Sequence, residues 1–351
     1  MKTTTLNIRY LVYGLCLVAS LYNCKTKDVD SLTPFTYTFK GFDTKLPDVT
    51  PTQPAAVSAT AGSVTSSTAA AAVTSGLSSL SAGGPVPAAV SNAAAAVSNA
   101  VSPEKAASLA ASFTPDLMKS LAAGGTLPAS LKAESEALAA NPALKAYLPS
   151  FTLPTVNGKA IGGRTGVGTP GNVIGAVAAA FLRADDDACK AAAIAAYNTA
   201  VQNLTTTRDA QLAAVNAVFT QAQAAANAEV TPCKANISGL YTTARTNATN
   251  QYNAGIAALD AGKAALGQTL YNALHVLYDV GYAQALAGIA ALETAQGGAC
   301  DAVNVAKQAA ATSARDGDLA KVNGNFNTAK ATLDKNLATA TASCHNQGNG
   351  G

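Results

Sequence analysis

Tryptophan is absent from this chain of 351 residues, and all aromatic residues together make up only 5% of it. Charged residues are also scarce, at 12%. The hydrophobic share of 49% is high, but alanine inflates it, and alanine forms helices well while burying little apolar area. The composition therefore favours helices that pack closely through small side chains over a thick mixed core.

A surplus of either charge is missing as well. Without Lys2 and Arg9, which belong to the N-terminal leader, 21 of the 23 basic residues remain against 20 acidic ones. No nucleic-acid partner is expected, because binding phosphates needs a basic surplus. Past residue 23 no run reaches about 18 uncharged apolar residues, so we expect no second membrane span.

Residues for catalysis are few. The chain has two histidines, and His275 lies among apolar neighbours in "ALHVLYDV", where a packing role is the usual one. His345 directly follows Cys344. Adjacent side chains on a helix point about 100° apart, so these two do not make a nucleophile–base pair. We expect no enzyme.

Two short motifs match ligand sites only formally. Gly166, Gly168 and Gly171 fit G-x-G-x-x-G, but no buried strand precedes them as a dinucleotide site requires, so this stretch predicts a hinge. Three aspartates at 185–187 could chelate a cation. A competent site needs about 6 to 8 oxygens in a shaped loop, and acids are also typical of a helix start. Neither cofactor nor metal is expected.

The N-terminus indicates export. Residues 10–21 form an uncharged, mostly apolar stretch of 12 residues, which suits a signal peptide and is too short to span a bilayer. The stretch "LYNC" ending at Cys24 then resembles the lipobox of bacterial lipoproteins. The resemblance implies cleavage before Cys24, acylation of its thiol, and anchoring in the cell envelope, most simply at the outer membrane. The alternative is ordinary secretion with cleavage after Ser20.

Cysteine parity favours the lipid anchor. Six cysteines occur, at 16, 24, 189, 233, 300 and 344. Ordinary cleavage would leave five, whereas acylation of Cys24 leaves four, enough for two disulfides. The four are spaced by 44, 67 and 44 residues, which does not fit the close pairs of a structural zinc site.

The chain changes character along its length. Residues 51–101 are almost entirely Ala, Ser, Thr, Val, Gly and Pro, and we expect a flexible or weakly helical spacer there. Ser102 and Thr114 are each followed by proline and an acid, a pattern that starts helices. The expected segments are a signal peptide (1–23), a lipid-anchored tether (24–50), the spacer (51–101), short helices (102–160), a Gly-rich hinge with a short helix (161–184), a long-helix bundle (185–345) and a tail (346–351).

Within the tether, "PFTYTF" alternates aromatic and polar residues. Phe35, Tyr37 and Phe39 would share one face of an extended segment. This face either docks on the body of the protein itself or pairs with the sheet edge of a partner.

The bundle region contains an internal repeat. "RDAQLAAVNAVFTQAQA" begins at Arg208 and "RDGDLAKVNGNFNTAKA" at Arg315. Each copy lies within a 44-residue segment bounded by cysteines, 189–233 and 300–344. We interpret the segments as copies of one long helix. With a helical middle segment, they predict an all-α fold: an elongated, coiled-coil-like bundle in up-down-up order, with parallel outer helices.

This bundle makes a prediction about disulfides. Two cysteines 44 residues apart on a straight helix lie roughly 66 Å apart, far beyond the about 7 Å that a disulfide allows. Parallel outer helices would therefore pair Cys189 with Cys300 and Cys233 with Cys344. If each segment folds as a hairpin, Cys189 pairs with Cys233 and Cys300 with Cys344.

Two functions are compatible with these features. The first is a non-enzymatic envelope lipoprotein whose helical module has a structural role or contacts an envelope protein or the cell wall. The second is a lipid-anchored binding protein that encloses a small apolar ligand in the bundle. The candidate ligand-lining residues are Tyr252, Tyr271, His275, Tyr278 and Tyr282.

Overall fold

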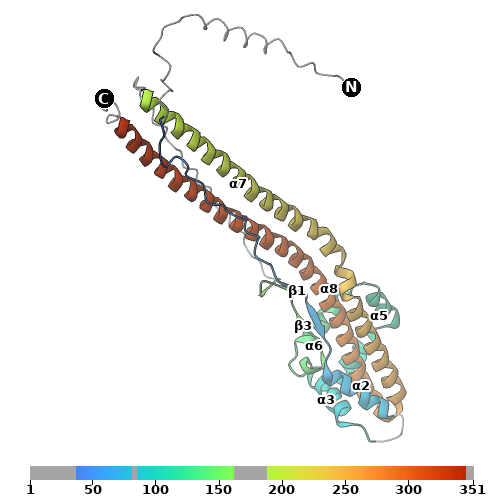
Figure 1. Ribbon diagram of the computed structural model, residues 1–351. Helices are drawn as coiled ribbons and strands as arrows, with labels where there is room; N and C mark the ends of the chain where they lie inside the picture. Colours follow the sequence, from blue (N-terminus) through green and yellow to red (C-terminus); the bar gives the residue numbers. More distant parts are fainter. Residues whose placement is uncertain (1–36, 81–84, 162–187, 345–351) are drawn as a thin grey trace, which may run out of the picture. The chain divides into compact units, whose positions relative to one another are not determined.

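The computed structural model describes residues 37–80, 85–161 and 188–344, and these ranges are predominantly helical (Figure 1). The expected all-α class is confirmed, with only short strands in the described ranges. The chain divides into two compact units. The described parts of the first unit are residues 37–46, 188–207 and 326–344, and those of the second are residues 47–80, 85–161 and 208–325.

Two long helices contribute to both units: α7 (Ala188–Ala235) and α8 (Ile237–Ser343). Gly267 interrupts α8 with a φ of 71° and a ψ of 164°. A side chain would be strained at this positive φ, and glycine adopts it readily. We call residues 208–266 the first arm of the second unit and residues 268–325 its second arm.

The two arms are antiparallel, because Gly267 reverses the chain direction. Close to the turn, Tyr271 bonds to Asp260. Further away Tyr252 bonds to Asp279, and Glu229 pairs with Lys307. Residue numbers thus rise along one arm as they fall along the other, which is a helical hairpin.

The expected parallel arrangement of 189–233 and 300–344 is therefore wrong. In the second unit, Arg315 lies over the ring of Phe219, 4.2 Å from its centroid, as antiparallel arms require. In the first unit, the Tyr197 hydroxyl donates to Asp334 at 2.5 Å, again between antiparallel segments.

Both disulfide pairings considered from the sequence are also wrong. Cys189 joins Cys344 in the first unit, and Cys233 joins Cys300 in the second, with Cα–Cα distances of 5.8 and 5.9 Å. Gly267 lies 34 residues after Cys233 and 33 before Cys300, and 78 after Cys189 and 77 before Cys344. Because Gly267 is nearly equidistant from the two cysteines of each pair, a turn there places them opposite each other.

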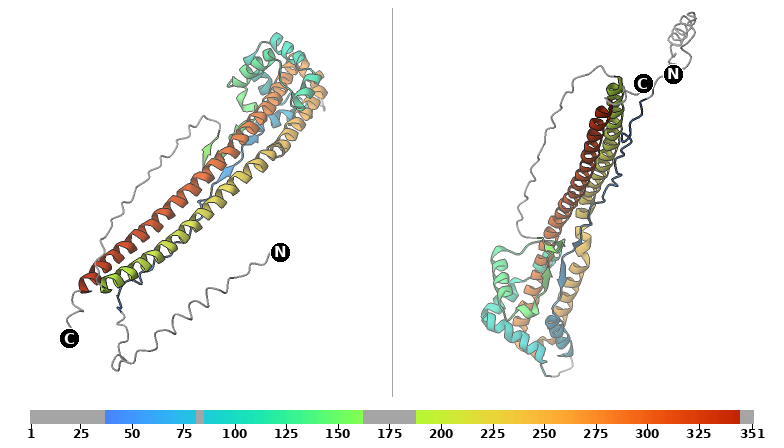
Figure 2. Two further views of the ribbon diagram at one scale, coloured as in Figure 1. Left: turned by 90° about the horizontal axis from the view of Figure 1, so that it is seen from above. Right: turned by 60° about the vertical axis from the view of Figure 1, so that its left-hand side comes forward.

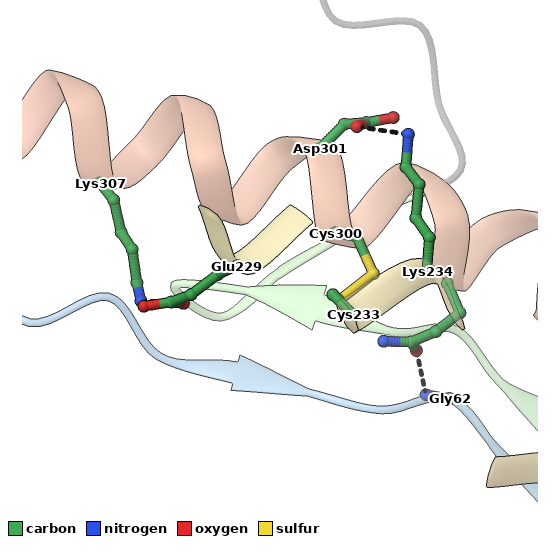
Figure 3. The surroundings of a disulfide bond; sticks show 8 residues. Gly62, Glu229, Cys233, Lys234, Cys300, Asp301 and Lys307 are labelled. Atoms are coloured by element: carbon green, nitrogen blue, oxygen red, sulfur yellow. Dashed lines mark hydrogen bonds and ion pairs between the residues drawn. A yellow bond between two sulfur atoms is a disulfide. The ribbon is translucent and has the colours of Figure 1, made fainter. Parts of the chain in front are cut away.

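Ion pairs flank the disulfide of the second unit (Figure 3). Lys234 bonds to Asp301 at 2.7 Å, and Lys307 bonds to Glu229 at 2.5 Å, on opposite sides of Cys233–Cys300. These pairs are substantially exposed and add little stability by themselves. The two pairs form together only when the arms are aligned in this one register.

Helix α8 buries a stripe of residues with a period of eleven. Such a period corresponds to about 3.67 residues per turn, so a stripe stays on one side of a long helix. The separation of 44 residues between the cysteines of a segment is four such periods. In α8 the stripe consists of Cys300, Ala311, Val322, Leu333 and Cys344, all buried.

The two repeat copies have equivalent positions that hold one extended segment. Gln211 of the first copy donates from Nε2 to the Pro47 carbonyl at 3.0 Å. The corresponding Asp318 of the second copy accepts from Thr52, from its N–H at 2.5 Å and its hydroxyl at 2.8 Å. We call residues 47–58 the strap; Figure 2 shows it lying along the arms.

Residues 37–46, assigned to the tether, pack within the first unit. Tyr37 stacks on Phe39, Phe39 meets Phe42 edge-on, and Phe42 meets Tyr197 of α7 in the same way. Leu46 is buried against Leu204 and Leu333. Tyr37 and Phe39 are thus linked to α7 through Phe42.

The low-complexity segment is folded, contrary to the expected flexible spacer. It contains strands β1 (Ala59–Thr60) and β2 (Ser63–Thr65) and helices α2 (Thr68–Leu80) and α3 (Ala88–Ala100). The helices pack closely because their contact residues are small: a Cβ on Gly76 would meet Val90 Cγ2 at 2.8 Å. Leu77 and Val97 are buried in a core shared with both arms.

The short helices begin where the sequence predicts. In α4 (Pro103–Ser112) and α5 (Pro115–Ala122), Ser102 and Thr114 accept hydrogen bonds from backbone N–H groups of the first turn. Helix α6 (Ala129–Ala140) and the 3₁₀ helix η2 (Lys145–Tyr147) follow. With α2 and α3 they gather around the arms near Gly267 (Figures 1 and 2).

Three further strands complete the second unit: β3 (Ser150–Thr152), β4 (Thr155–Val156) and β5 (Lys159–Ala160). They form two small antiparallel sheets, β1–β4–β5 and β2–β3. Ala59 pairs with Val156, and Val64 with Phe151. The sheets fasten the strap's end and the start of α2 beside the arms.

Several expectations concern residues outside the described ranges: the signal peptide with Cys24, Phe35, the glycine-rich hinge, the aspartates at 185–187, and His345. Within the described ranges, no helix combines the length and apolar character needed to cross a bilayer.

The pairing is directly testable, because trypsin places each of the four cysteines on its own peptide. Non-reducing peptide mapping of the protein should yield Cys189 linked to Cys344 and Cys233 linked to Cys300. A Cys189–Cys300 or Cys189–Cys233 peptide would contradict the hairpin.

The folded state of the low-complexity segment predicts a large effect of Leu77→Ala. Leu77 is 1% exposed, and truncating a buried leucine lowers the free energy of unfolding by about 2–5 kcal/mol. Leu153, 45% exposed, is the control, and its change to Ala should cost less than about 0.5 kcal/mol. Urea unfolding measures both; equal, small effects would mean that α2 does not pack in the core.

Candidate functional site

The second unit contains a cavity of about 280 Å³ between α2 and the two arms. Its walls come from three places along the chain: the β2–α2 region, the first arm around residue 250 and the second arm around residue 280. The principal lining residues are Val73, Thr74, Ala248, Tyr252, Leu277, Tyr278, Gly281 and Tyr282.

Small residues create this space. A Cβ on Gly281 would have only Leu148 Cδ2 within reach, at 4.0 Å, so the backbone of the second arm borders open volume there. Ala71, Ala248 and Ala285 add further short side chains to the lining. The Tyr278 ring lies against Gly255 of the first arm, where a Cβ would come within 2.2 Å of it. Gly255 thus allows the Tyr278 ring to pack closely, and Gly281 leaves open space beside the second arm.

Four tyrosines line the cavity, and the hydroxyls of Tyr252, Tyr278 and Tyr282 each have a protein partner. The rings of Tyr252 and Tyr282 stack with centroids 4.6 Å apart and an interplanar angle of 15°. The Tyr282 hydroxyl lies 3.0 Å from Thr249 Oγ1, and the Tyr278 hydroxyl 2.8 Å from Thr74 Oγ1. These bonds hold the rings in position.

A buried carboxylate lies behind Tyr252. Asp279 is fully buried; it accepts from the Tyr252 hydroxyl at 3.0 Å and lies 2.6 Å from His275 Nδ1, one helical turn earlier. Burial raises the pKa of the Asp279 carboxyl above its ordinary value, against the opposing effect of the His275 and Tyr252 hydrogen bonds. Buried charged groups are stable when paired and hydrogen-bonded, as here.

The same pair changes the imidazole. Burial by itself lowers the pKa of His275, but the hydrogen bond and negative charge of Asp279 outweigh it, and the pKa is raised overall. The raised pKa favours the protonated imidazole beside Asp279. On the next turn the Tyr271 ring tilts toward His275, and its hydroxyl donates to Asp260 at 2.6 Å.

The tyrosines remain neutral phenols. Burial and the nearby Asp279 raise the pKa of Tyr252 far above the ordinary phenol value, and burial raises that of Tyr278. Burial and the hydrogen bond to Asp260 raise the pKa of Tyr271 to about 12. A phenol in this state is a hydrogen-bonding group and no nucleophile.

The structure brings together part of the set expected from the sequence. Tyr252, Tyr278 and Tyr282 line the cavity, whereas Tyr271 and His275 do not. His275 is linked to the cavity through Asp279, which binds Tyr252, and the Tyr271 ring lies beside His275. Thr74 escaped sequence reasoning because it lies in a segment assigned to a spacer, and Asp279 because a lone aspartate four residues after a histidine is a common helix-surface pattern.

Other ligand chemistry has less support within the described ranges. They hold no group of three or more His, Cys, Asp or Glu side chains that could bind a metal ion. Among these residues, the hydrogen-bond partner of the His275 ring is the Asp279 carboxylate, which accepts from Nδ1.

Comparison of the chain with protein-family models, with curated proteins and with solved structures gave no match. The cavity must therefore be interpreted from its own chemistry.

The His275–Asp279 pair predicts opposite pKa shifts in two variants. In the unaltered protein the His275 pKa should exceed the ordinary value of about 6.5. In Asp279→Asn the effect of burial dominates, and the pKa should fall below that value, whereas Asp260→Asn should keep it raised. NMR titration of the imidazole resolves this, with His345 as the only other histidine.

The same shift has a sign for stability. Because folding raises the His275 pKa, its protonation stabilises the fold at pH values below the imidazole's unfolded pKa, and this contribution is lost as pH rises through the folded pKa. A His275 pKa that is the same in Asp279→Asn and in the unaltered protein would contradict the buried pair.

Proposed function

We propose that this chain is a non-enzymatic, lipid-anchored binding protein of the cell envelope that holds a small, largely apolar ligand in the tyrosine-lined cavity. The observation that carries the proposal is the cavity itself, an apolar space with a few hydroxyls at its wall and a buried ionic pair behind it. This combination is the usual character of small-molecule sites.

The position of the polar groups supports binding over mere packing. Near the Cys233–Cys300 disulfide the ion pairs between the arms are exposed. The buried Asp318 of the second arm binds Thr52 of the strap. Near the turn, in contrast, the chain buries Asp279 at 0% exposure. Burying a charge in this way is costly unless it serves a specific arrangement, and here it fixes the Tyr252 hydroxyl at the cavity.

The size of the cavity suits a small ligand. At about 280 Å³ it lies near the lower end of the range of small-molecule pockets. Alanine, glycine and serine account for much of the lining, so most contacts would be made to backbone-near atoms and to the tyrosine rings. Shape would then select a compact, apolar molecule.

Envelope location is supported by the N-terminal sequence and by the cysteines. The lipobox-like stretch ending at Cys24 implies acylation, and disulfides are characteristic of oxidising compartments outside the cytoplasm. The four cysteines of the body are all paired. An anchored protein with a cavity would concentrate its ligand at the membrane surface.

A second candidate is a structural or protein-interaction module. Two disulfides across antiparallel helices favour it, because they suit a rigid helical unit that contacts another envelope protein or the cell wall. Affinity capture from solubilised membranes with and without added apolar ligand separates the candidates, since a purely structural contact would be indifferent to the ligand.

Filling the cavity should abolish binding. Gly281→Leu places a side chain into the open volume, and we expect at least a tenfold weaker affinity for an uncharged apolar fluorophore such as Nile red. Gly317→Leu is the matched control, because a Cβ at Gly317, also in α8, would meet nothing within 4 Å. Both variants should keep their helical circular dichroism. Equal binding by both would refute the cavity as the site.

Acylation is tested separately with Cys24→Ser. The unaltered protein should partition with membranes, and the variant should move to the soluble fraction, because one acylated cysteine supplies the anchor. The C233S/C300S variant, which keeps Cys24, serves as the control and should stay with the membranes. Unchanged partitioning of Cys24→Ser would disprove the anchor while leaving the cavity untouched.

A further inference from the structure

We infer that the cavity selects a ligand carrying a hydroxyl that donates a hydrogen bond, in preference to the same carbon skeleton carrying only an acceptor. The inference rests on the proposed binding function and follows from where each tyrosine proton in the cavity wall is directed.

Tyr278 has to donate its proton to Thr74. A hydroxyl has one proton to donate and two lone pairs that accept. Thr74 Oγ1 donates to the Ala70 carbonyl one turn earlier in α2, at 3.3 Å. The 2.8 Å contact between Thr74 and Tyr278 is then a hydrogen bond only if the phenol donates. The Tyr278 oxygen keeps its lone pairs and has no proton left for a ligand.

Tyr282 has the same arrangement on the first arm. Thr249 Oγ1 donates to the Arg245 carbonyl at 3.0 Å, again one helical turn earlier. The Tyr282 hydroxyl, 3.0 Å from Thr249 Oγ1, is therefore the donor of that pair. A second cavity phenol thus has only acceptor capacity remaining.

Tyr252 completes the set through Asp279. An ionised carboxylate can only accept, and Asp279 faces the imidazole of His275 as its ionic partner. The Tyr252 hydroxyl, 3.0 Å from Asp279 Oδ1, donates to it. Tyr252, Tyr278 and Tyr282, three of the four tyrosines that line the cavity, therefore direct their protons into the protein.

The remaining polar lining is mostly exposed to water or already committed. Ser67 donates to the Ala146 carbonyl at 2.6 Å. Ser66, Asn247 and Gln251 are exposed residues, so water competes for their hydrogen bonds. Ser75 is exposed as well. Tyr147 is half-buried, and its hydroxyl can either donate or accept. The sheltered wall is thus dominated by acceptors.

An uncharged hydroxyl fits this wall better than an ammonium group. The nearest buried carboxylate, Asp279, already has an ionic partner in His275 and is screened from the cavity by Tyr252. A ligand cation would lose its hydration without gaining an unpaired anion. A ketone would instead face phenol lone pairs with its own lone pairs, and an unpaired buried acceptor is unfavourable.

The test uses menthol and menthone, which share a skeleton and differ as alcohol and ketone. Each displaces Nile red from the purified, disulfide-intact full chain, and menthol should bind at least about tenfold more tightly. Equal affinities, or tighter binding of menthone, would overturn the inference while the binding function stands. Failure of both to displace the probe would overturn both proposals. Tighter binding of menthylamine than of menthol would mean that the cavity prefers a cation to a hydroxyl, and it would contradict the inference.

Two variants test the proton directions. Thr74→Val removes the acceptor of Tyr278 at nearly constant shape, which frees the phenol proton for the ligand, so the menthol-to-menthone preference should fall several-fold. Thr249→Val should act likewise through Tyr282, and it keeps the test available if one variant folds poorly. Thr242→Val is the control, because exposed Thr242 makes the same backbone bond, to Ser238, away from the cavity. An unchanged preference in well-folded Thr74→Val and Thr249→Val would overturn the inference.

Discussion

The position of one glycine relative to four cysteines is the constraint from which most of this structure follows. Gly267 lies at the common midpoint of Cys189–Cys344 and of Cys233–Cys300, so a single reversal of chain direction brings both pairs into register. Once the arms are antiparallel, they bury apolar residues of both, such as Leu259 and Leu274, in one core. The disulfides then limit sliding between the arms, and a fixed register is what allows Tyr252 to meet Asp279 across them.

The cavity is a consequence of how the turn end of this hairpin is covered. Helix α2 lies over the arms there, and its small residues, with Gly281 and Ala248 below, leave space that tyrosine rings border without filling. Each of these phenols is held by one hydrogen-bond partner: Thr74, Thr249 or Asp279. Rigid rings with committed protons are suited to discriminate among ligands, because the protein does not reorganise its own hydrogen bonds on binding.

The sequence predicted the helical class and the capped short helices well, because alanine content and the Ser102 and Thr114 caps act locally. Orientation could not be predicted that way. The equal 44-residue spacings suggested parallel copies, yet equal spacings are also symmetric about Gly267. The glycine at this common midpoint was the decisive signal. The low-complexity segment was misjudged because valines and leucines such as Leu77 are sparse but all fall on one helix face. The tyrosines stood out, whereas their threonine partners come from distant turns.

The central claim is that a ligand occupies the space between Tyr252, Tyr278 and Tyr282. The most direct measurement is a set of intermolecular nuclear Overhauser effects between bound menthol and the assigned tyrosine ring protons of the disulfide-intact protein. The account predicts contacts from the menthol methyl groups to the rings of these three tyrosines. Contacts confined to exposed apolar side chains such as Leu240 or Val305, with none to the three rings, would contradict it.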